Sequence, residues 1–190
     1  MESIYIEDKN FNGNDFTVSG IEQGNYENCR FLNCNLSEVN LSGINFLECS
    51  FDACNLGMAK LGNTGLRDIK FIGCKLLGLH FEHCNPIGLS MHFDNCILNL
   101  SSFYRLRLKG TVFKNSILHE ADLTDTDLTN ARFDNCDLEG TIFGNTILEK
   151  ADLTTAYNYS IDPASNKIKK AKFSMPGVIG LLDNYDIVIE

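Results

Sequence analysis

The sequence predicts an all-β solenoid, in which the chain coils around one axis and successive coils stack through strand-like hydrogen bonds. A bulky apolar residue recurs at every fifth position over most of the 190 residues. This period fits neither the 3.6-residue repeat of an α-helix nor the two-residue repeat of a β-strand. A second row, of small residues, lies two positions before the bulky one, and the three prolines lie where the repeat is interrupted.

The bulky row forms two runs. The first steps in fives from Phe11 to Phe81 and the second from Phe93 to Leu153, and each position holds Leu, Phe, Ile or Tyr. Each five-residue unit therefore supplies one bulky and one small inward residue. If the chain turns a corner after every unit, four units close a square coil of about 20 residues, and the coils stack about 4.8 Å apart. The bulky side chains then form ladders inside the coil.

The small row contains all eight cysteines. Thiols at inward positions behave as small apolar groups that fill the core. The coil spacing of about 4.8 Å would also hold stacked cysteines too far apart for a disulfide, whose Cβ atoms lie about 3.8 Å apart. We therefore expect packed, reduced thiols at Cys29, Cys34, Cys49, Cys54, Cys74, Cys84, Cys96 and Cys136.

Units such as ADLTD, TDLTN, ARFDN, CDLEG and ADLTT are similar to pentapeptide repeats, whose consensus is Ala-Asp/Asn-Leu/Phe-x-x. The chain resembles the pentapeptide-repeat family over residues 9–156, approximately. This resemblance implies a right-handed quadrilateral β-helix of about seven coils. We assign residues 1–156 to the β-helix. Within it the repeat slips by two residues at 85–92, and Pro86 there predicts a small outward loop, because proline has no N–H to donate to a ladder.

Residues 157–190 are expected to form a C-terminal loop, one partial repeat and a capping or dimerisation segment. Pro176 suits the start of a short helix that ends near Asn184, and 186–189 predicts a strand. One role is a cap over the open end of the solenoid. The other is a homodimer contact. The apolar residues for that contact are Val178, Leu181, Leu182, Tyr185, Ile187 and Ile189.

Composition limits the function. The net charge of −9 and the pI of about 4.9 argue against binding of nucleic-acid phosphates. The start MESIYIEDKN does not have the pattern of a signal peptide, and no stretch approaches the ~20 apolar residues of a membrane span. We expect a cytoplasmic protein without membrane contact.

No motif of an enzyme or of a metal site is found in the sequence. There is no Ser/His/Asp or Cys/His pairing and no glycine-rich phosphate loop. His80 and His83 flank Phe81 and are expected in separate outward columns. We therefore expect neither catalysis, nor a metal, nor a cofactor.

The strongest functional lead is a concentration of acidic residues in 119–139, the acidic coil. Seven acidic residues against Arg132 alone give a local charge of −6. Because this segment spans one coil, the charges would form a ring around the rod. The acidic residues are Glu120, Asp122, Asp125, Asp127, Asp134, Asp137 and Glu139.

A second interpretation of these charges stays open. Residues 20 apart stack, which would place Arg105 under Asp125, Lys114 under Asp134 and Arg132 under Asp152, and such pairs neutralise the surface. Nearer the N-terminus, one column stacks acid on acid, at a cost in stability unless something basic docks there. That column contains Asp8, Asn28, Glu48 and Asp68.

The C-terminal stretch from Gly180 to Ile189 is similar to the ending of Qnr-type quinolone-resistance proteins, a subgroup of the family. This resemblance implies a dimeric DNA mimic that binds a type II topoisomerase, DNA gyrase or topoisomerase IV, and that protects it from fluoroquinolones or inhibits it. The acidic residues above are the expected partner-binding surface. The alternative is a generic protein-interaction scaffold whose partner is unknown.

Overall fold

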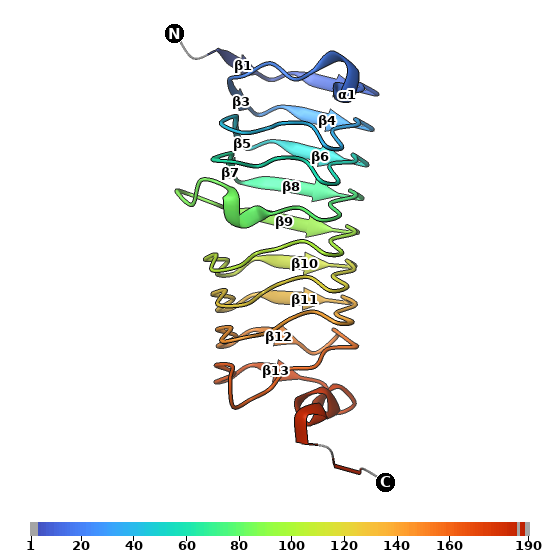
Figure 1. Ribbon diagram of the computed structural model, residues 1–190, viewed down its shortest axis with the longest axis vertical. Helices are drawn as coiled ribbons and strands as arrows, with labels where there is room; N and C mark the ends of the chain where they lie inside the picture. Colours follow the sequence, from blue (N-terminus) through green and yellow to red (C-terminus); the bar gives the residue numbers. More distant parts are fainter. Residues whose placement is uncertain (1–3, 186, 189–190) are drawn as a thin grey trace.

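The computed structural model describes residues 4–185 and 187–188. The chain forms a parallel β-solenoid of about eight turns, with its two ends at opposite ends of a rod (Figure 1). The predicted fold class is confirmed. No helix in the described residues has the length and apolar character needed to cross a bilayer.

Short parallel strands form the walls of the coil, and each turn of the chain adds the next strand to a sheet. One sheet has the order β1 (Tyr5–Glu7), β3 (Asn25–Glu27), β5 (Asn45–Leu47) and β7 (Gly65–Arg67). The other begins with β13 (Lys172–Phe173), β12 (Asp152–Leu153), β11 (Arg132–Asp134), β10 (Val112–Lys114) and β9 (Met91–Asp94). It continues with β8 (Ile69–Ile72), β6 (Ser50–Asp52), β4 (Arg30–Leu32) and β2 (Asn10–Asn12).

The register confirms the predicted 20-residue coil. Phe113 pairs with Phe133 in the long sheet, and isolated bridges such as Ile97 with Ile117 continue the ladder on another wall. Between β8 and β9 the step is longer, since Phe71 pairs with Phe93. The two extra residues form the predicted outward loop, which begins after the 3-10 turn η1 (Phe81–His83).

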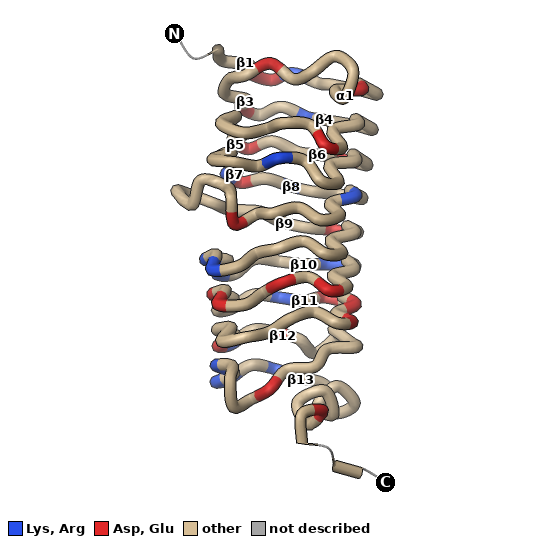
Figure 2. The backbone as a smooth tube through the Cα atoms, in the orientation of Figure 1, with Lys and Arg blue, Asp and Glu red and all other residues tan. Residues whose placement is uncertain are grey.

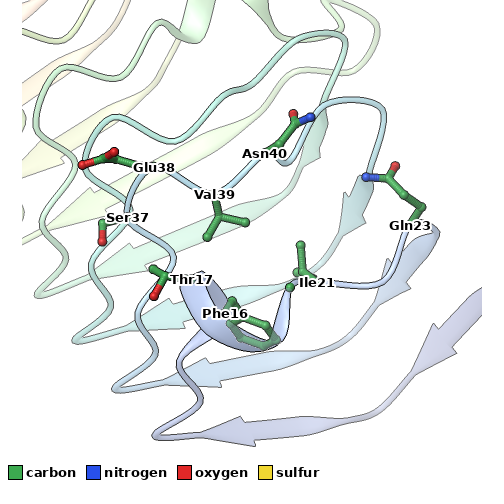
Figure 3. Close-up of a pocket in the computed structure, with 9 residues that line it drawn as sticks. Phe16, Thr17, Ile21, Gln23, Ser37, Glu38, Val39 and Asn40 are labelled. Atoms are coloured by element: carbon green, nitrogen blue, oxygen red, sulfur yellow. The ribbon is translucent and has the colours of Figure 1, made fainter.

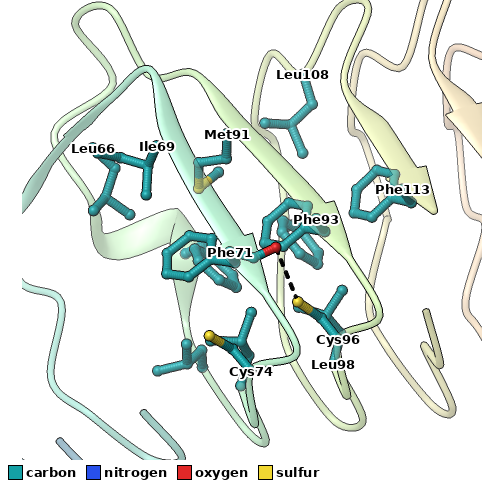
Figure 4. Packing of buried hydrophobic residues seen from close by; sticks show 14 of the residues in the cluster. Leu66, Ile69, Phe71, Cys74, Met91, Phe93, Cys96, Leu98, Leu108 and Phe113 are labelled. Atoms are coloured by element: carbon teal, nitrogen blue, oxygen red, sulfur yellow. Dashed lines mark hydrogen bonds between the residues drawn. The ribbon is translucent and has the colours of Figure 1, made fainter. Parts of the chain in front are cut away.

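The bulky row fills the inside of the rod. Its residues are buried, except that Phe11 and Ile21 in the first coil are partly buried. Phenylalanines stack along the axis, with ring centroids 5.0 Å apart for Phe93 and Phe113 (Figure 4) and 4.7 Å apart for Phe81 and Phe103. Rings of neighbouring ladders meet edge to face. The core is therefore one continuous apolar column.

The small row does more than fill space. Its thiols and hydroxyls donate to main-chain carbonyls one coil earlier: Cys96 Sγ lies 3.4 Å from the Phe71 oxygen (Figure 4), and Thr64 Oγ1 lies 2.8 Å from the Leu41 oxygen. All eight cysteines are free and buried, as predicted. Burial raises the pKa of Cys49 and Cys136 to about 12, which keeps these thiols protonated.

The corners of the coil recur every fifth residue, and the backbone there adopts a left-handed conformation. The residue two positions after the bulky one has a positive φ, for example 52° at Asn33, 56° at Asp125 and 66° at Gly140. Asn, Asp and Gly tolerate this left-handed conformation best. The fold therefore favours part of the acidic and amide content of the surface.

Both ends depart from the repeat. In the first coil a short helix, α1 (Phe16–Ser19), follows Asp15, whose carboxylate accepts from the Thr17 N–H; the sequence did not predict this helix. At the other end, the helix predicted after Pro176 is present as two 3-10 turns, η2 (Gly177–Leu181) and η3 (Asp183–Tyr185). The strand predicted over 186–189 is wrong at Ile187 and Val188, which form no strand; Asp186 and Ile189 lie outside the described residues.

The 3-10 turns cover the last coil. The Gly180 carbonyl accepts from the Ile161 N–H at 2.8 Å, and Leu181 packs against the core. Position 180 must be glycine, because any side chain there would collide with the Tyr159 carbonyl oxygen. The capping role is thus visible in the structure.

Candidate functional site

The acidic coil lies around β11, and acidic segments stand at both edges of the rod at this level (Figure 2). Its aspartates carry charge and also accept hydrogen bonds from nearby backbone N–H groups. The carboxylates of Asp122, Asp127 and Asp137 each accept from the N–H two residues later, at 2.9, 3.1 and 3.3 Å. These turns explain why aspartate suits the second position of a unit.

Basic residues one coil below neutralise part of the acidic coil. Arg105 Nε lies 3.3 Å from Asp125 Oδ2, the predicted stack, and Lys109 Nζ lies 3.2 Å from Asp127 Oδ2. Burial opposes ionisation of Asp127, but the hydrogen bonds from Thr129 and Lys109 outweigh it and hold the pKa of the carboxyl below its ordinary value.

The two other predicted stacks have the expected register but different ion pairs. Lys114 stands beside Asp134 in the ladder, yet its Nζ binds Asp94 on the opposite side at 2.9 Å. Arg132 stands beside Asp152, yet it binds Asp134 in its own strand at 2.6 Å. The long side chains reach either neighbour, so register alone did not determine the partner.

Asp137 has a different environment. Its Oδ2 lies 3.0 Å from His119 Nε2, and its Oδ1 accepts from Asn158 Nδ2 at 2.9 Å. Burial disfavours the charged carboxylate, but the contacts with His119 and Asn158 prevail and lower its pKa. Glu139 Oε2 is 3.9 Å from the same His119 nitrogen.

Sequence reasoning missed His119. Within the described residues, His119, Asp137 and Glu139 form a group whose ligand-type atoms all lie within 4.8 Å of one another. The 20-residue period was the available signal, because it places His119 directly beside Glu139 in the neighbouring coil.

Four acidic side chains of this coil form no ion pair with Lys or Arg in the described part of the chain. Asp137 contacts His119 instead, and the other three are Glu120, Asp122 and Glu139. Glu120 is exposed at a corner with φ of 55°, and the Glu139 side chain is 72% exposed. These carboxylates are the free charge of the acidic coil.

The second acidic column is less uniform than the sequence suggested. Asp8, Glu48 and Asp68 are exposed at positive-φ corners, but Asn28 lies between the first two and donates to Asp8 Oδ1 at 2.6 Å. Asp68 accepts from Ser90 Oγ at 3.0 Å. The structure does not join this column to the acidic coil, because β9 and β10 lie between β8, which follows Asp68, and β11.

The C-terminal residues proposed for dimerisation divide into two groups. Leu181 and Leu182 are half-buried, whereas Val178, Tyr185 and Ile187 are exposed by 39%, 53% and 54%. Ile189 lies outside the described residues. The cap therefore leaves apolar side chains in solvent at the end of the rod.

The prediction that His80 and His83 lie in separate outward columns is wrong. The η1 turn brings His80 and His83 together, so that their rings stack with centroids 5.3 Å apart instead of occupying separate columns. His80 Nδ1 also lies 2.9 Å from Glu82 Oε1. A turn that breaks the repeat cannot be placed by counting in fives.

An open hollow of about 690 Å³ lies beside α1 in the first coils (Figure 3). Phe16 and Val39 form its floor, and the polar side chains of Gln23, Glu38 and Asn40 stand around it. It exists because α1 replaces a regular wall of the coil. None of the predicted site residues lines this hollow.

The chain is similar to known proteins in its sequence repeat and in its fold. A family model described as "Pentapeptide repeat region" matches residues 24–88 and 89–156. No curated protein sequence matches the chain. Two solved structures of trypsin-treated variants of QnrB1, described as a plasmid-mediated fluoroquinolone resistance protein, are similar in fold. One has a TM-score of 0.65 and 17% identity and covers 98% of this chain and 100% of its own. The other has a TM-score of 0.63 and 17% identity, with 100% of both chains covered.

Proposed function

This chain belongs to the pentapeptide repeat family, and we propose that it is a DNA mimic that binds a type II topoisomerase, DNA gyrase or topoisomerase IV. The observation that carries the proposal is a rod of net charge −9 whose fold is similar over its whole length to a fluoroquinolone resistance protein. A surface that binds DNA is positively charged. It therefore attracts a negatively charged rod as it attracts DNA. The proposed role is non-catalytic and requires no cofactor.

The free carboxylates Glu120, Asp122 and Glu139 are the proposed contacts, together with the acidic column of Asp8, Glu48 and Asp68. Carboxylates that form no ion pair with Lys or Arg keep their charge for a partner. Such an interaction should weaken steeply as salt is added, because exposed charges are screened within about 10 Å at 0.1 M ionic strength.

A supercoiling assay with purified DNA gyrase, with and without ciprofloxacin, tests this function. Inhibition of supercoiling, or rescue from the drug, is expected in the wild type. The triple variant Glu120→Gln, Asp122→Asn, Glu139→Gln should lose most of the effect. The control replaces three exposed glutamates outside the acidic coil, Glu7→Gln, Glu22→Gln and Glu27→Gln.

We also propose that two chains pair through the cap. Val178, Ile179, Tyr185 and Ile187 together leave an apolar surface at the end of the rod, and two-fold pairing would bury it and double the length of the acidic rod. Light scattering should give twice the mass of the 21.2 kDa chain. Ile179→Lys with Ile187→Lys should give a monomer, whereas Val18→Lys, an exposed site at the other end, should not.

The second candidate function is a protein-interaction scaffold with an unknown partner. The ion pairs favour it, since Arg105, Lys109 and Arg132 place positive charge next to Asp125, Asp127 and Asp134. If neither topoisomerase is affected at high molar excess of the protein, the DNA-mimic proposal fails and this function takes its place.

A further inference from the structure

We propose that His119, Asp137 and Glu139 bind a divalent transition-metal ion, with Zn²⁺ as the best match, on the outer wall of the solenoid. One imidazole and two carboxylates are a ligand set that zinc accepts. This inference shares Glu139 with the proposed topoisomerase contacts, but it concerns an ion that the chain binds by itself.

The separations between the three groups fit one ion. His119 Nε2 lies 3.0 Å from Asp137 Oδ2 and 3.9 Å from Glu139 Oε2. Ligand atoms at about 2.0–2.1 Å from a tetrahedral zinc ion stand roughly 3.3 Å apart, within this range. Small side-chain rotations therefore suffice to bring all three atoms onto one ion.

The topology brings these ligands together without a loop. His119 and Glu139 occupy the same position in neighbouring coils, and the N–H of the residue after His119 donates to the Glu139 carbonyl at 3.0 Å. Asp137 lies two residues before Glu139 on the same coil. Backbone hydrogen bonds thus fix the three Cα atoms, so that little conformational entropy remains to be lost on binding.

The imidazole nitrogen faces the carboxylates. His119 Nε2 lies 3.0 Å from Asp137 Oδ2, although their alignment is poor for a hydrogen bond. A metal ion between the two groups would use the lone pair of the nitrogen. An ion pair alone explains the arrangement less well, since two carboxylates face one imidazole and leave negative charge uncompensated.

Surrounding residues supply the support that a metal site requires. Asn158 Nδ2 donates to Asp137 Oδ1 at 2.9 Å, which leaves Oδ2 for the ion. Asn99 lies one coil before His119 in the same column, and its buried Oδ1 has no hydrogen-bond partner. Because the Glu139 side chain is 72% exposed, the ion would keep a coordination position open to water or to a partner's side chain.

Metal titration of the full chain tests this site. After treatment with a chelator, the protein is titrated with ZnCl₂ in a calorimeter and with CoCl₂ in a spectrophotometer. We expect one equivalent of Zn²⁺ per chain and the visible absorption of low-coordinate Co²⁺. His119→Gln and Asp137→Asn should abolish both signals, and Asn158→Ala should weaken binding about tenfold by releasing Asp137.

Two matched controls separate the site from adventitious binding. His92→Gln removes an imidazole elsewhere, and Asp134→Asn removes a carboxylate of the acidic coil outside the cluster; both should bind as the wild type does. Circular dichroism confirms that each variant is folded. Absence of stoichiometric binding, or equal binding by His119→Gln, overturns the proposal. Loss of binding in His80→Gln with retention in His119→Gln would assign the metal to the loop histidines and overturn it too. Topoisomerase inhibition is also measured with His119→Gln, which removes the proposed metal site and keeps Glu120, Asp122 and Glu139, so failure of one proposal is distinguishable from failure of the other.

Discussion

The hydroxyl of Thr126 donates a hydrogen bond to the main-chain carbonyl of Phe103, 23 residues earlier, with 2.8 Å between the oxygens. The same carbonyl also accepts from the Leu106 N–H at 3.1 Å. Equivalent bonds from Thr141 and Thr146 join the later coils. The small row therefore links consecutive coils through polar contacts in addition to packing between the walls.

Replacing Thr126 by valine tests this link. The shape of the side chain is kept and the hydrogen bond is lost, while the Phe103 carbonyl retains its second donor. We expect the free energy of unfolding to fall by about 1 kcal/mol in urea denaturation. Thr124→Val, a half-buried residue of the preceding unit outside the row, is the control. No difference between the two variants would show that the row acts by size alone.

The phenylalanine ladder should be most sensitive at the middle of the rod. Phe113 is fully buried, and its ring stacks on Phe93 at 5.0 Å and on Phe133 at 4.9 Å. Phe113→Ala should cost about 3–5 kcal/mol, because the rigid coils cannot collapse into the cavity. Since each coil contacts only its neighbours, denaturation should also lose cooperativity. Phe11→Ala, in the partly buried first coil, should cost less and keep a single transition.

Because the thiols are buried, we expect the free energy of unfolding to fall at alkaline pH. Burial raises the pKa of Cys49, Cys84 and Cys136 from 9.0 to about 12 in the folded protein. A raised folded-state pKa contributes stability that is present below pH 9 and is lost as the pH rises from 9 towards 12. Urea denaturation across that interval should show the decline. The Cys49→Ala, Cys136→Ala variant should decline less, with the remainder due in part to Tyr26, whose pKa burial also raises to about 12.

Counting in fives predicted the coil, its inward rows and the slip, because the buried positions alone determine this fold. Leu123, Leu128, Phe133 and Leu138 occupy the interior as the period requires. The period could not predict α1, which depends on a local hydrogen bond from the Thr17 N–H to the Asp15 carboxylate. It also could not predict the stacking of His80 on His83 in a turn of irregular backbone.

The candidate site was predicted less completely for a physical reason. The sequence identifies which residues face outward, and the register gives their neighbours. A long side chain, however, can form an ion pair with any of several neighbours. Lys114 binds Asp94 and Arg132 binds Asp134, and neither choice follows from the ladder. His119 could have been found by stacking residues 20 apart. The core residues do not identify the binding partner, because outward residues can change without disturbing the core.

The corners offer a way to stabilise the rod. Leu100 is 56% exposed and has a φ of 58°, a conformation in which its Cβ crowds the backbone. Leu100→Asn should raise the free energy of unfolding by a few tenths to about 1 kcal/mol, because asparagine tolerates this region better. Thermal denaturation measures it. Met58→Asn, at an equivalent corner with φ of 59°, should behave alike, and destabilisation in both would contradict the strain argument.

Removing the positive charges next to the acidic coil distinguishes the two candidate functions. Arg105 and Lys109 are exposed and neutralise Asp125 and Asp127, so Arg105→Gln with Lys109→Gln frees two carboxylates. Exposed pairs contribute only ~0–1 kcal/mol each, and the fold should persist. If the chain mimics DNA, the variant should bind a type II topoisomerase more tightly at low salt, with the gain lost at high salt. Lys60→Gln with Lys70→Gln makes the same change in net charge away from this coil. An equal gain in the control would assign the effect to total charge, and no gain in either would favour the scaffold.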